Sequence, residues 1–197
     1  AMQRLALAAI HSWLRGRDRQ EPMRLLEAGC GTGRLLCQIA ENWPDGHFTA
    51  LDLSPYYLDA CKASYADWRS SRPHAPSADF LVANVEELPL SDSSMDVVVC
   101  AYVFHELPPS AREAAAAEFY RVLRPGGLCV LLDSAQSGDL GRDMDGTLEW
   151  FPRTFHEPYY SSWLRLDLDG LFRPLGFASF ARGLRHVTKM AAWMKPA

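Results

Sequence analysis

Short apolar runs alternate with longer segments of mixed character along most of this chain. The runs compact enough for buried strands are 23–28, 47–51, 78–83, 95–101 and 128–132. The run Met95–Ala101 is apolar at every position after Asp96, as in strands buried on both faces of a parallel sheet. The segments between the runs carry apolar residues at helical spacing. This alternation predicts an α/β fold with a doubly wound sheet.

Helices are expected between these strands and near both ends of the chain, over residues 2–14, 34–42, 54–68, 108–123 and 161–175. The third helix begins at Ser54-Pro55, a capping hydroxyl followed by proline at the first helical position. Two late segments, 177–184 and 186–194, favour an antiparallel pair of strands at the sheet edge. The sheet is therefore expected to be seven-stranded, mostly parallel with an antiparallel edge strand.

The 197 residues fit one domain with a sizeable core. Its expected parts are an N-terminal helix and linker (1–22), a core (23–133), a polar insert acting as a lid (134–160) and a C-terminal helix with the edge strands (161–197). Within the first part, 16–22 is a charged linker. Ala1 and Met2 are typical of residues added before a native start or before an excised domain.

Composition narrows the class of protein. Hydrophobic residues make up 48% and charged residues 22%, as in ordinary globular proteins. A formal net charge of −4 gives no general attraction to nucleic acid. We find no signal peptide and no apolar run long enough for a membrane span, and the five cysteines lack metal-ligand spacing. We therefore expect a cytoplasmic protein with reduced thiols, acting as a monomer or homodimer.

Chemically useful residues follow the strands at their carboxyl ends, where ligands of such sheets bind. Glycines at 29, 31 and 33 form a tight loop before a helix N-terminus, whose free N–H groups suit an electron-rich ligand group. Other residues at strand ends are Glu27, Asp52, Asn84, Tyr102 and Asp133.

Three of these residues point to one cofactor. Glu27, just ahead of the glycine loop, repels a pyrophosphate but suits an α-amino group. Asp52 is placed to accept both hydroxyls of a ribose, and Asn84 to bond an adenine edge. An amino acid, a ribose and an adenine in that order describe S-adenosylmethionine.

Five motifs then carry a resemblance to a known family. They are LEAGCGTG (26–33), LDLS (51–54), NVEELP (84–89), FHEL (104–107) and RVLRPGG (121–127). In order and spacing they resemble class I S-adenosylmethionine-dependent methyltransferases, most closely the type 11 small-molecule methyltransferases, which include quinone-biosynthesis-like members. The resemblance implies a Rossmann-like fold. It also implies methyl transfer to a small, partly apolar or aromatic metabolite, by in-line displacement at the sulfonium methyl.

The resemblance also assigns cofactor-binding residues. They are Glu27, Gly29, Cys30, Gly31, Asp52, Leu53, Asn84, Val85, Ala101 and Tyr102. Asn84 departs from the family, which more often has aspartate there. The amide carbonyl can still accept a hydrogen bond from the adenine amino group, so we expect binding that is weaker.

The acceptor is expected beyond strands four and five. A hydroxyl acceptor needs a general base, whereas a carbon or carboxylate acceptor needs less or none. His105 and His156 are the candidate catalytic bases. The candidate substrate contacts are His105, Glu106, Tyr159 and Tyr160. Equally open is a purely structural role, in which His105 and Glu106 cap the next helix and the aromatic residues pack a lid.

No catalytic metal is expected. A metal-dependent catechol enzyme would need an acid set that Ala101-Tyr102 and Asp133-Ser134 do not supply. Two other functions stay open as alternatives. One is a non-catalytic domain that binds S-adenosylmethionine or a partner and keeps the fold. The other is an NAD-type oxidoreductase, which the glycine loop and Asp52 support but Glu27 and the glycine spacing oppose.

Overall fold

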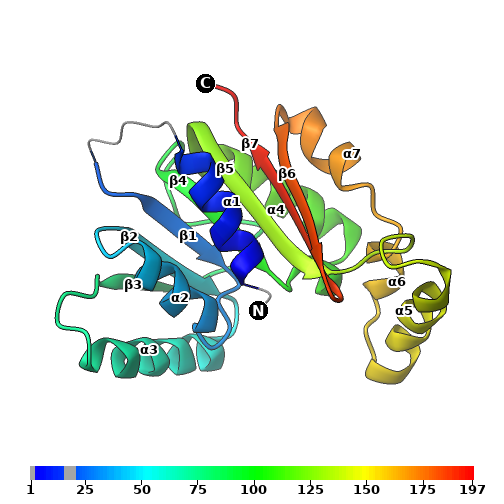
Figure 1. The fold of residues 1–197 in the computed structure, drawn as a ribbon, viewed down its shortest axis with the longest axis horizontal. Helices are drawn as coiled ribbons and strands as arrows, with labels where there is room; N and C mark the ends of the chain where they lie inside the picture. Colours follow the sequence, from blue (N-terminus) through cyan, green and yellow to red (C-terminus); the bar gives the residue numbers. More distant parts are fainter. Residues whose placement is uncertain (1–2, 16–20) are drawn as a thin grey trace.

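We describe the fold from a computed structural model, which covers residues 3–15 and 21–197. The expectations for Ala1, Met2 and most of the charged linker, 16–20, lie outside the described residues. One sheet has the strand order β3-β2-β1-β4-β5-β7-β6 (Figure 1). The strands are β1 (Arg24–Ala28), β2 (His47–Asp52), β3 (Ala78–Val82), β4 (Met95–Ala101), β5 (Leu123–Ser134), β6 (Ala178–Arg185) and β7 (Thr188–Met194).

Helices connect and cover these strands. They are α1 (Arg4–Leu14), α2 (Arg34–Asn42), α3 (Pro55–Ser70), α4 (Pro109–Val122), α5 (Arg142–Phe155), α6 (Tyr160–Trp163) and α7 (Leu168–Phe172). Two 3-10 turns are η1 (Phe104–Glu106) and η2 (Arg173–Leu175). Strand β7 runs antiparallel to both of its neighbours, β5 and β6, and the other pairings are parallel. The expected mixed seven-stranded sheet is confirmed.

Alternate side chains of the central strands face opposite helical layers. Leu25 of β1 packs in a cluster with residues of α1, α2 and α3. Leu26, the next residue, packs in a second cluster with residues of α4, α6 and α7. Figure 1 shows α1 and α2 in front of the sheet and α4 behind it. Burial on both faces explains the unbroken apolar run of β4, whose first six residues are buried.

The predicted start of α3 is confirmed in detail. The side-chain oxygen of Ser54 accepts a hydrogen bond from the backbone N–H of Tyr57, at 3.3 Å, and Pro55 occupies the first helical position. This cap satisfies one of the N–H groups that a helix start leaves free. The helix therefore begins directly after Asp52 and Leu53, at the edge where the strands end.

Strand β5 begins earlier than the sequence predicts. The expected strand covers 128–132, but β5 already starts at Leu123. Gly126 N–H donates to the carbonyl of Lys195, and Lys195 N–H donates to Gly127, at 2.8 and 3.0 Å. The indole N–H of Trp13 also donates to Gly126. Gly126 has a left-handed backbone, with φ of 78°, and these long-range bonds fasten the two glycines to Lys195 and Trp13.

The expected helix over 161–175 is wrong, because the chain forms α6, α7 and η2 there instead. The side-chain amide of the buried Gln136 donates to the carbonyls of Trp163 and Leu166, at 2.7 and 2.8 Å. In a continuous α-helix, each of these carbonyls would accept a hydrogen bond from the backbone N–H four residues later. A side chain from a distant segment thus fills the break between α6 and α7.

The insert holds a helix that its polar composition did not predict. Helix α5 has its own apolar face, on which Leu148 is buried and the rings of Phe151 and Phe155 stack at 4.6 Å. Phe151 also packs against Tyr160, at 5.1 Å between ring centroids. This apolar face packs α5 against α6, in the lower right of Figure 1.

Two loop glycines give a matched test of packing. Gly31 and Gly33 both have positive φ, at 51° and 79°. A Cβ on Gly33 would lie 2.6 Å from Sγ of Cys61, whereas a Cβ on Gly31 would meet no atom of the described structure within 4 Å. We predict that Gly31→Ala lowers the free energy of unfolding by about 1 kcal/mol, the left-handed backbone cost.

Gly33→Ala should lower the free energy of unfolding by a further 1–3 kcal/mol or so, because overpacking adds to the same backbone cost. Urea denaturation of both variants and the wild type measures the difference. Equal losses in the two variants would contradict the close packing of Gly33 on Cys61.

Candidate functional site

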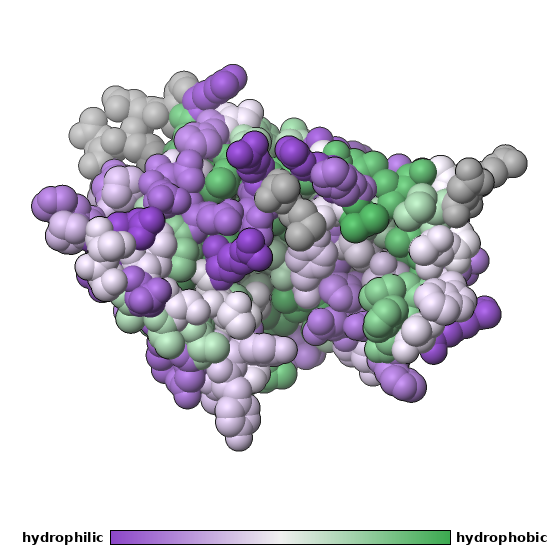
Figure 2. Space-filling model, turned by 60° about the horizontal axis from the view of Figure 1, so that its bottom comes forward, coloured by the Kyte–Doolittle hydropathy of each residue, from purple (hydrophilic) through white to green (hydrophobic). Residues whose placement is uncertain are grey.

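A cavity of about 420 Å³ lies at the carboxyl ends of the parallel strands. All the predicted cofactor-binding residues line it, namely Glu27, Gly29, Cys30, Gly31, Asp52, Leu53, Asn84, Val85, Ala101 and Tyr102. Figure 2 brings this edge forward and shows a depression between the part that carries α2 and α3 and the part that carries α5. The topology thus brings residues from four strand ends around one space.

Glu27 lies near the carboxyl end of β1, and it is almost fully buried, at 2% exposed. Its Oε2 has no hydrogen-bond partner among the described residues. Burial raises the pKa of this carboxyl well above its ordinary value; the nearby Cys61 and Asp52 raise it too, and a backbone hydrogen bond from Leu36 opposes them. A buried polar atom without a partner is costly. A cationic ligand group in the cavity would satisfy it.

Asp52 is held in place by the glycine loop and by the start of α3. Its Oδ2 accepts from the backbone N–H of Gly31 and its Oδ1 from that of Ser54, both at 2.9 Å. Each carboxylate oxygen keeps further acceptor capacity. The oriented carboxylate can therefore accept from a pair of hydroxyls. Above Gly31 the space is open, so a ligand can approach the backbone closely.

Asn84 and its neighbours form the far end of the cavity. The side-chain oxygen of Asn84 accepts a hydrogen bond from the backbone N–H of Glu86, at 3.1 Å. The side-chain NH₂ of Asn84 donates to the Glu86 carboxylate, at 3.0 Å. These two bonds fix which way the amide faces, with one acceptor position of its oxygen left over. Leu53, 68% exposed, and Tyr57, 56% exposed, supply apolar surface beside it.

Tyr102 follows β4 in a left-handed backbone conformation, with φ of 58°. Its N–H donates to the carbonyl of Leu132, and its hydroxyl shares a hydrogen bond with the hydroxyl of Thr188 on β7. Burial raises the pKa of the phenol, although the bond to Thr188 opposes this. The hydroxyl is therefore tied to the sheet, while the residue lines the cavity.

His105 forms a close pair with Asp133, the last residue but one of β5. Its Nδ1 lies 2.6 Å from Oδ1 of Asp133, and its backbone N–H donates to Oδ2 of Asp133, at 3.3 Å. Asp133 is 1% exposed and His105 12% exposed at the side chain. The sequence does not predict this contact, because it identifies Asp133 only as a residue at the end of a strand.

The pKa of His105 is set by opposing effects. Burial lowers it, but the hydrogen bond and charge of Asp133, with the charges of Glu106 and Glu157, outweigh burial, and the net pKa is raised. Nε2 of His105 lies 3.8 Å from the Glu106 carboxylate, too far for a hydrogen bond. Glu106 lines the cavity, whereas His105 is not one of its lining residues and lies next to the lining through this contact.

The other residues that were candidates for contact with the methyl acceptor do not lie close together. His156 is exposed at the end of α5 and does not line the cavity. Tyr160 is buried, and its ring meets the His105 ring edge-on, at 5.7 Å between centroids. Tyr159 is 38% exposed and lies outside the cavity lining. Of the five candidate residues, all of them described, Glu106 alone lines the cavity, and His105 lies directly beside it.

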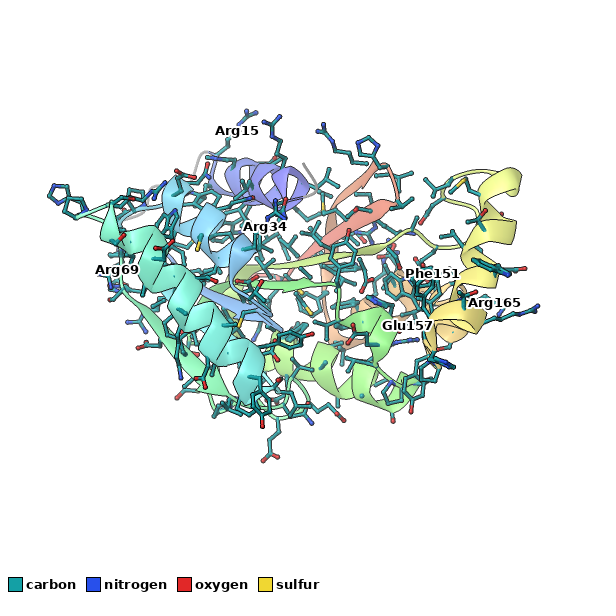
Figure 3. The ribbon with its side chains drawn as sticks, turned by 90° about the horizontal axis from the view of Figure 1, so that it is seen from below. Arg15, Arg34, Arg69, Phe151, Glu157 and Arg165 are labelled. Atoms are coloured by element: carbon teal, nitrogen blue, oxygen red, sulfur yellow. The ribbon has the colours of Figure 1, made fainter. Side chains whose placement is uncertain are left out.

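Some lining residues were not anticipated as site residues. They are Gln3, Thr32, Arg34, Leu35, Tyr57, Val103, Leu107 and Leu132. Thr32 and Arg34 belong to the glycine loop and the first turn of α2, so the loop motif could have indicated them. Arg34 is labelled in Figure 3. Gln3 comes from the N-terminal segment, and only the packing of α1 brings it here.

The described ranges hold no group of three or more histidine, cysteine, aspartate or glutamate residues arranged to bind a metal ion. No helix in these ranges is both long and apolar enough to cross a bilayer. The five cysteines, all described, are free thiols.

Comparison with known proteins shows which family this site belongs to. Residues 25–127 match the family described as methyltransferase domain. A ubiquinone/menaquinone biosynthesis C-methyltransferase of Methylobacterium nodulans is 34% identical over 117 residues, 59% of this chain and 44% of that protein. A malonyl-[acyl-carrier protein] O-methyltransferase of Dechloromonas aromatica is 36% identical over 138 residues, 69% of this chain and 40% of that protein. The chain thus spans less than half the length of these relatives.

A solved structure gives the same fold. An S-adenosylmethionine-dependent methyltransferase of Methanosarcina mazei superposes with a TM-score of 0.74 and 19% identity, over 95% of this chain and 96% of that one. Glu27, Asp52 and Asn84, which line the strand-end cavity, lie within the region matched by the family. The chain therefore belongs to the class I S-adenosylmethionine-dependent methyltransferase family.

Proposed function

We propose that this chain transfers the methyl group of S-adenosylmethionine to a small, partly apolar or aromatic metabolite. The observation that carries the proposal is the arrangement of Glu27, Asp52 and Asn84 at three strand ends around one cavity. They follow β1, β2 and β3, which are neighbours in the sheet, and this order supports binding of the amino acid, ribose and adenine in turn. When bound, S-adenosylmethionine supplies a methyl group already activated by the positive sulfur.

The residues present fit this cofactor. The unpaired Oε2 of Glu27 offers an acceptor for the α-ammonium group. The carboxylate of Asp52, fixed by two backbone N–H groups, accepts from the ribose hydroxyls. The open space above Gly31 leaves room for the chain of the amino acid. The remaining acceptor position of Asn84 suits the adenine amino group.

For a hydroxyl acceptor, we assign the general base to His105. Asp133 accepts a hydrogen bond from the protonated Nδ1, which leaves Nε2 as the basic nitrogen. Nε2 takes the hydroxyl proton, and the carboxylate of Asp133 stabilises the imidazolium that forms. Glu106 lines the cavity beside it. Alignment of the acceptor and exclusion of water supply the rest of the rate.

The acceptor class rests on the aromatic residues around His105. Tyr102, Tyr160 and Phe151 form a continuous row with it, at centroid distances of 6.3, 5.7 and 5.1 Å between neighbours. Figure 3 shows Phe151 on the side of α5 that faces the body of the domain. The names of two relatives, for methylation in quinone biosynthesis and of a malonyl carrier protein, also support a metabolite acceptor.

Loss of the ribose contact is the first test. We predict that Asp52→Ala weakens binding of S-adenosylhomocysteine at least about tenfold, because charge-assisted hydrogen bonds are worth about 1.5–3 kcal/mol. Asp59→Ala is the matched control, since Asp59 lies on α3 in an exposed pair with Lys62. Isothermal titration calorimetry measures both. Unchanged affinity in Asp52→Ala would count against the proposed cofactor site.

Proton release tests the role of Glu27. The pKa of Glu27 is raised well above its ordinary value in the free protein, chiefly by burial. An ammonium group favours the carboxylate, so binding should release a proton, and affinity should rise as pH increases toward that raised pKa. Calorimetry of S-adenosylhomocysteine binding in buffers of different ionisation enthalpy measures the release. The proton release and the pH slope should both disappear in Glu27→Gln; their persistence would reject this role.

Turnover tests the His105 assignment. Protein with tritiated methyl donor and a metabolite extract should place label in a small molecule, and His105→Gln should lower that rate by about 100-fold or more. Binding of S-adenosylhomocysteine should stay unchanged. The wild-type rate should rise with pH as His105 loses its proton, and the midpoint should fall in Asp133→Asn. Label transfer at the wild-type rate in His105→Gln would reject the base. Cofactor binding with no transfer at all would favour a binding domain.

A further inference from the structure

A buried arginine lies behind the proposed base and outside the cavity. Arg112 of α4 is 1% exposed. All three hydrogen bonds that its guanidinium donates within the described residues go to neutral acceptors. Burying a charge among neutral groups is costly unless its hydrogen bonds are well satisfied. Packing alone therefore does not explain a buried guanidinium at this position.

Its partners belong to two segments that meet beside His105. Nε donates to the carbonyl of Phe104 at 2.7 Å, and Nη2 to the carbonyl of Tyr159 at 3.0 Å. Nη1 donates to the hydroxyl of Ser162, also at 3.0 Å. Phe104 opens η1, which carries His105 and Glu106. Tyr159 and Ser162 belong to the segment of α6, separated from Arg112 by 47 and 50 residues.

The geometry of the guanidinium makes this a rigid connection. Its donors lie in one plane at fixed angles, so the two carbonyls are held in a fixed relation to each other. The two segments carry rings that touch, since His105 and Tyr160 meet edge-on at 5.7 Å. A shift of α6 relative to η1 would therefore break the contact between Tyr160 and His105.

We propose that Arg112 is a positioning residue for methyl transfer, which fastens the η1 turn to α6 and so keeps His105 against Asp133. The role of His105 as base rests on the proposed function above. The fastening itself does not, because it concerns the structure of the free protein. Lysine at this position keeps the charge but lacks the planar fork that reaches three acceptors.

A charge effect and a positioning effect on His105 have opposite signs. Burial lowers the pKa of Arg112, and the charge of Asp133 raises it, so Arg112 and Asp133 interact electrostatically. If Arg112 acted by charge alone, its removal would raise the pKa of His105, because a nearby positive charge is lost. If it positions η1, its removal separates His105 from Asp133, and the pKa of His105 falls.

The groups that face His105 from the surrounding elements are few. They are Asp133 on β5, Glu106 on η1, Glu157 between α5 and α6, Tyr160 on α6 and Tyr102 after β4. In Figure 3, Glu157 lies on the side of the insert that faces α4, whereas Arg165 points outward. None of these groups is altered by a substitution at Arg112.

The experiment follows the imidazole of His105 by NMR in histidine-labelled protein, with His105→Gln to assign its signal. In Arg112→Met and Arg112→Lys, we expect the pKa of His105 to fall toward the ordinary histidine value of about 6.5. Ser162→Ala, which removes one of the three bonds, is the control and should shift it far less. Hydrogen exchange should show faster exchange in Phe104–Glu106 and Tyr160–Trp163 together, with β1 and α2 unchanged.

Two outcomes would overturn the proposal. A higher pKa of His105 in Arg112→Met, with no change in Arg112→Lys, would show that only the charge matters. Unchanged titration and exchange in both variants would show that Arg112 does not hold the turn. If Arg112→Met does not fold, Arg112→Lys carries the test by itself. Calorimetry with S-adenosylhomocysteine on the wild type separately tests the proposed function, so the two can fail independently.

Discussion

Burial of the central parallel strands on both faces is the constraint on which the rest of this structure depends. Strands β1, β4 and β5 send alternate side chains into two helical layers, as Leu25 and Leu26 do from β1. With both faces covered, the carboxyl ends of these strands form an edge where polar groups can meet a ligand. The cavity is therefore a consequence of how the sheet is buried, and the parallel pairing decides which residues surround it.

Three acids lie at this edge, and their partners give them different roles. Asp52 is oriented by two backbone N–H groups, and Asp133 is bonded to His105. Glu27 keeps one oxygen without a partner in the described structure, although it is almost fully buried. Because unsatisfied buried polar atoms are costly, Glu27 is the acid whose environment a cationic ligand would improve most. The cost of an unsatisfied buried polar atom, which applies to folding in general, therefore also points to the ligand site.

The errors of sequence-based prediction share one cause. The expected helix over 161–175 is interrupted where the side chain of Gln136 donates to two backbone carbonyls. Strand β5 begins before the expected 128–132, where Gly126 and Gly127 bond with Lys195. Local propensity favours a helix in one case and a turn in the other. In both, hydrogen bonds from residues far along the chain decide the outcome, and a local pattern does not contain that information.

The sequence by itself determined the order of the strands, the glycine loop and the strand-end residues that line the cavity. It could do so because successive strands of a parallel sheet end at one edge, so order along the chain becomes neighbourhood in space. Only the tertiary structure decided that His105 pairs with Asp133, 28 residues away, and that His156 is exposed at the end of α5. It likewise decided that Arg112 joins η1 to α6. Such contacts depend on how distant segments pack, and side-chain partners are chosen only when that packing is complete.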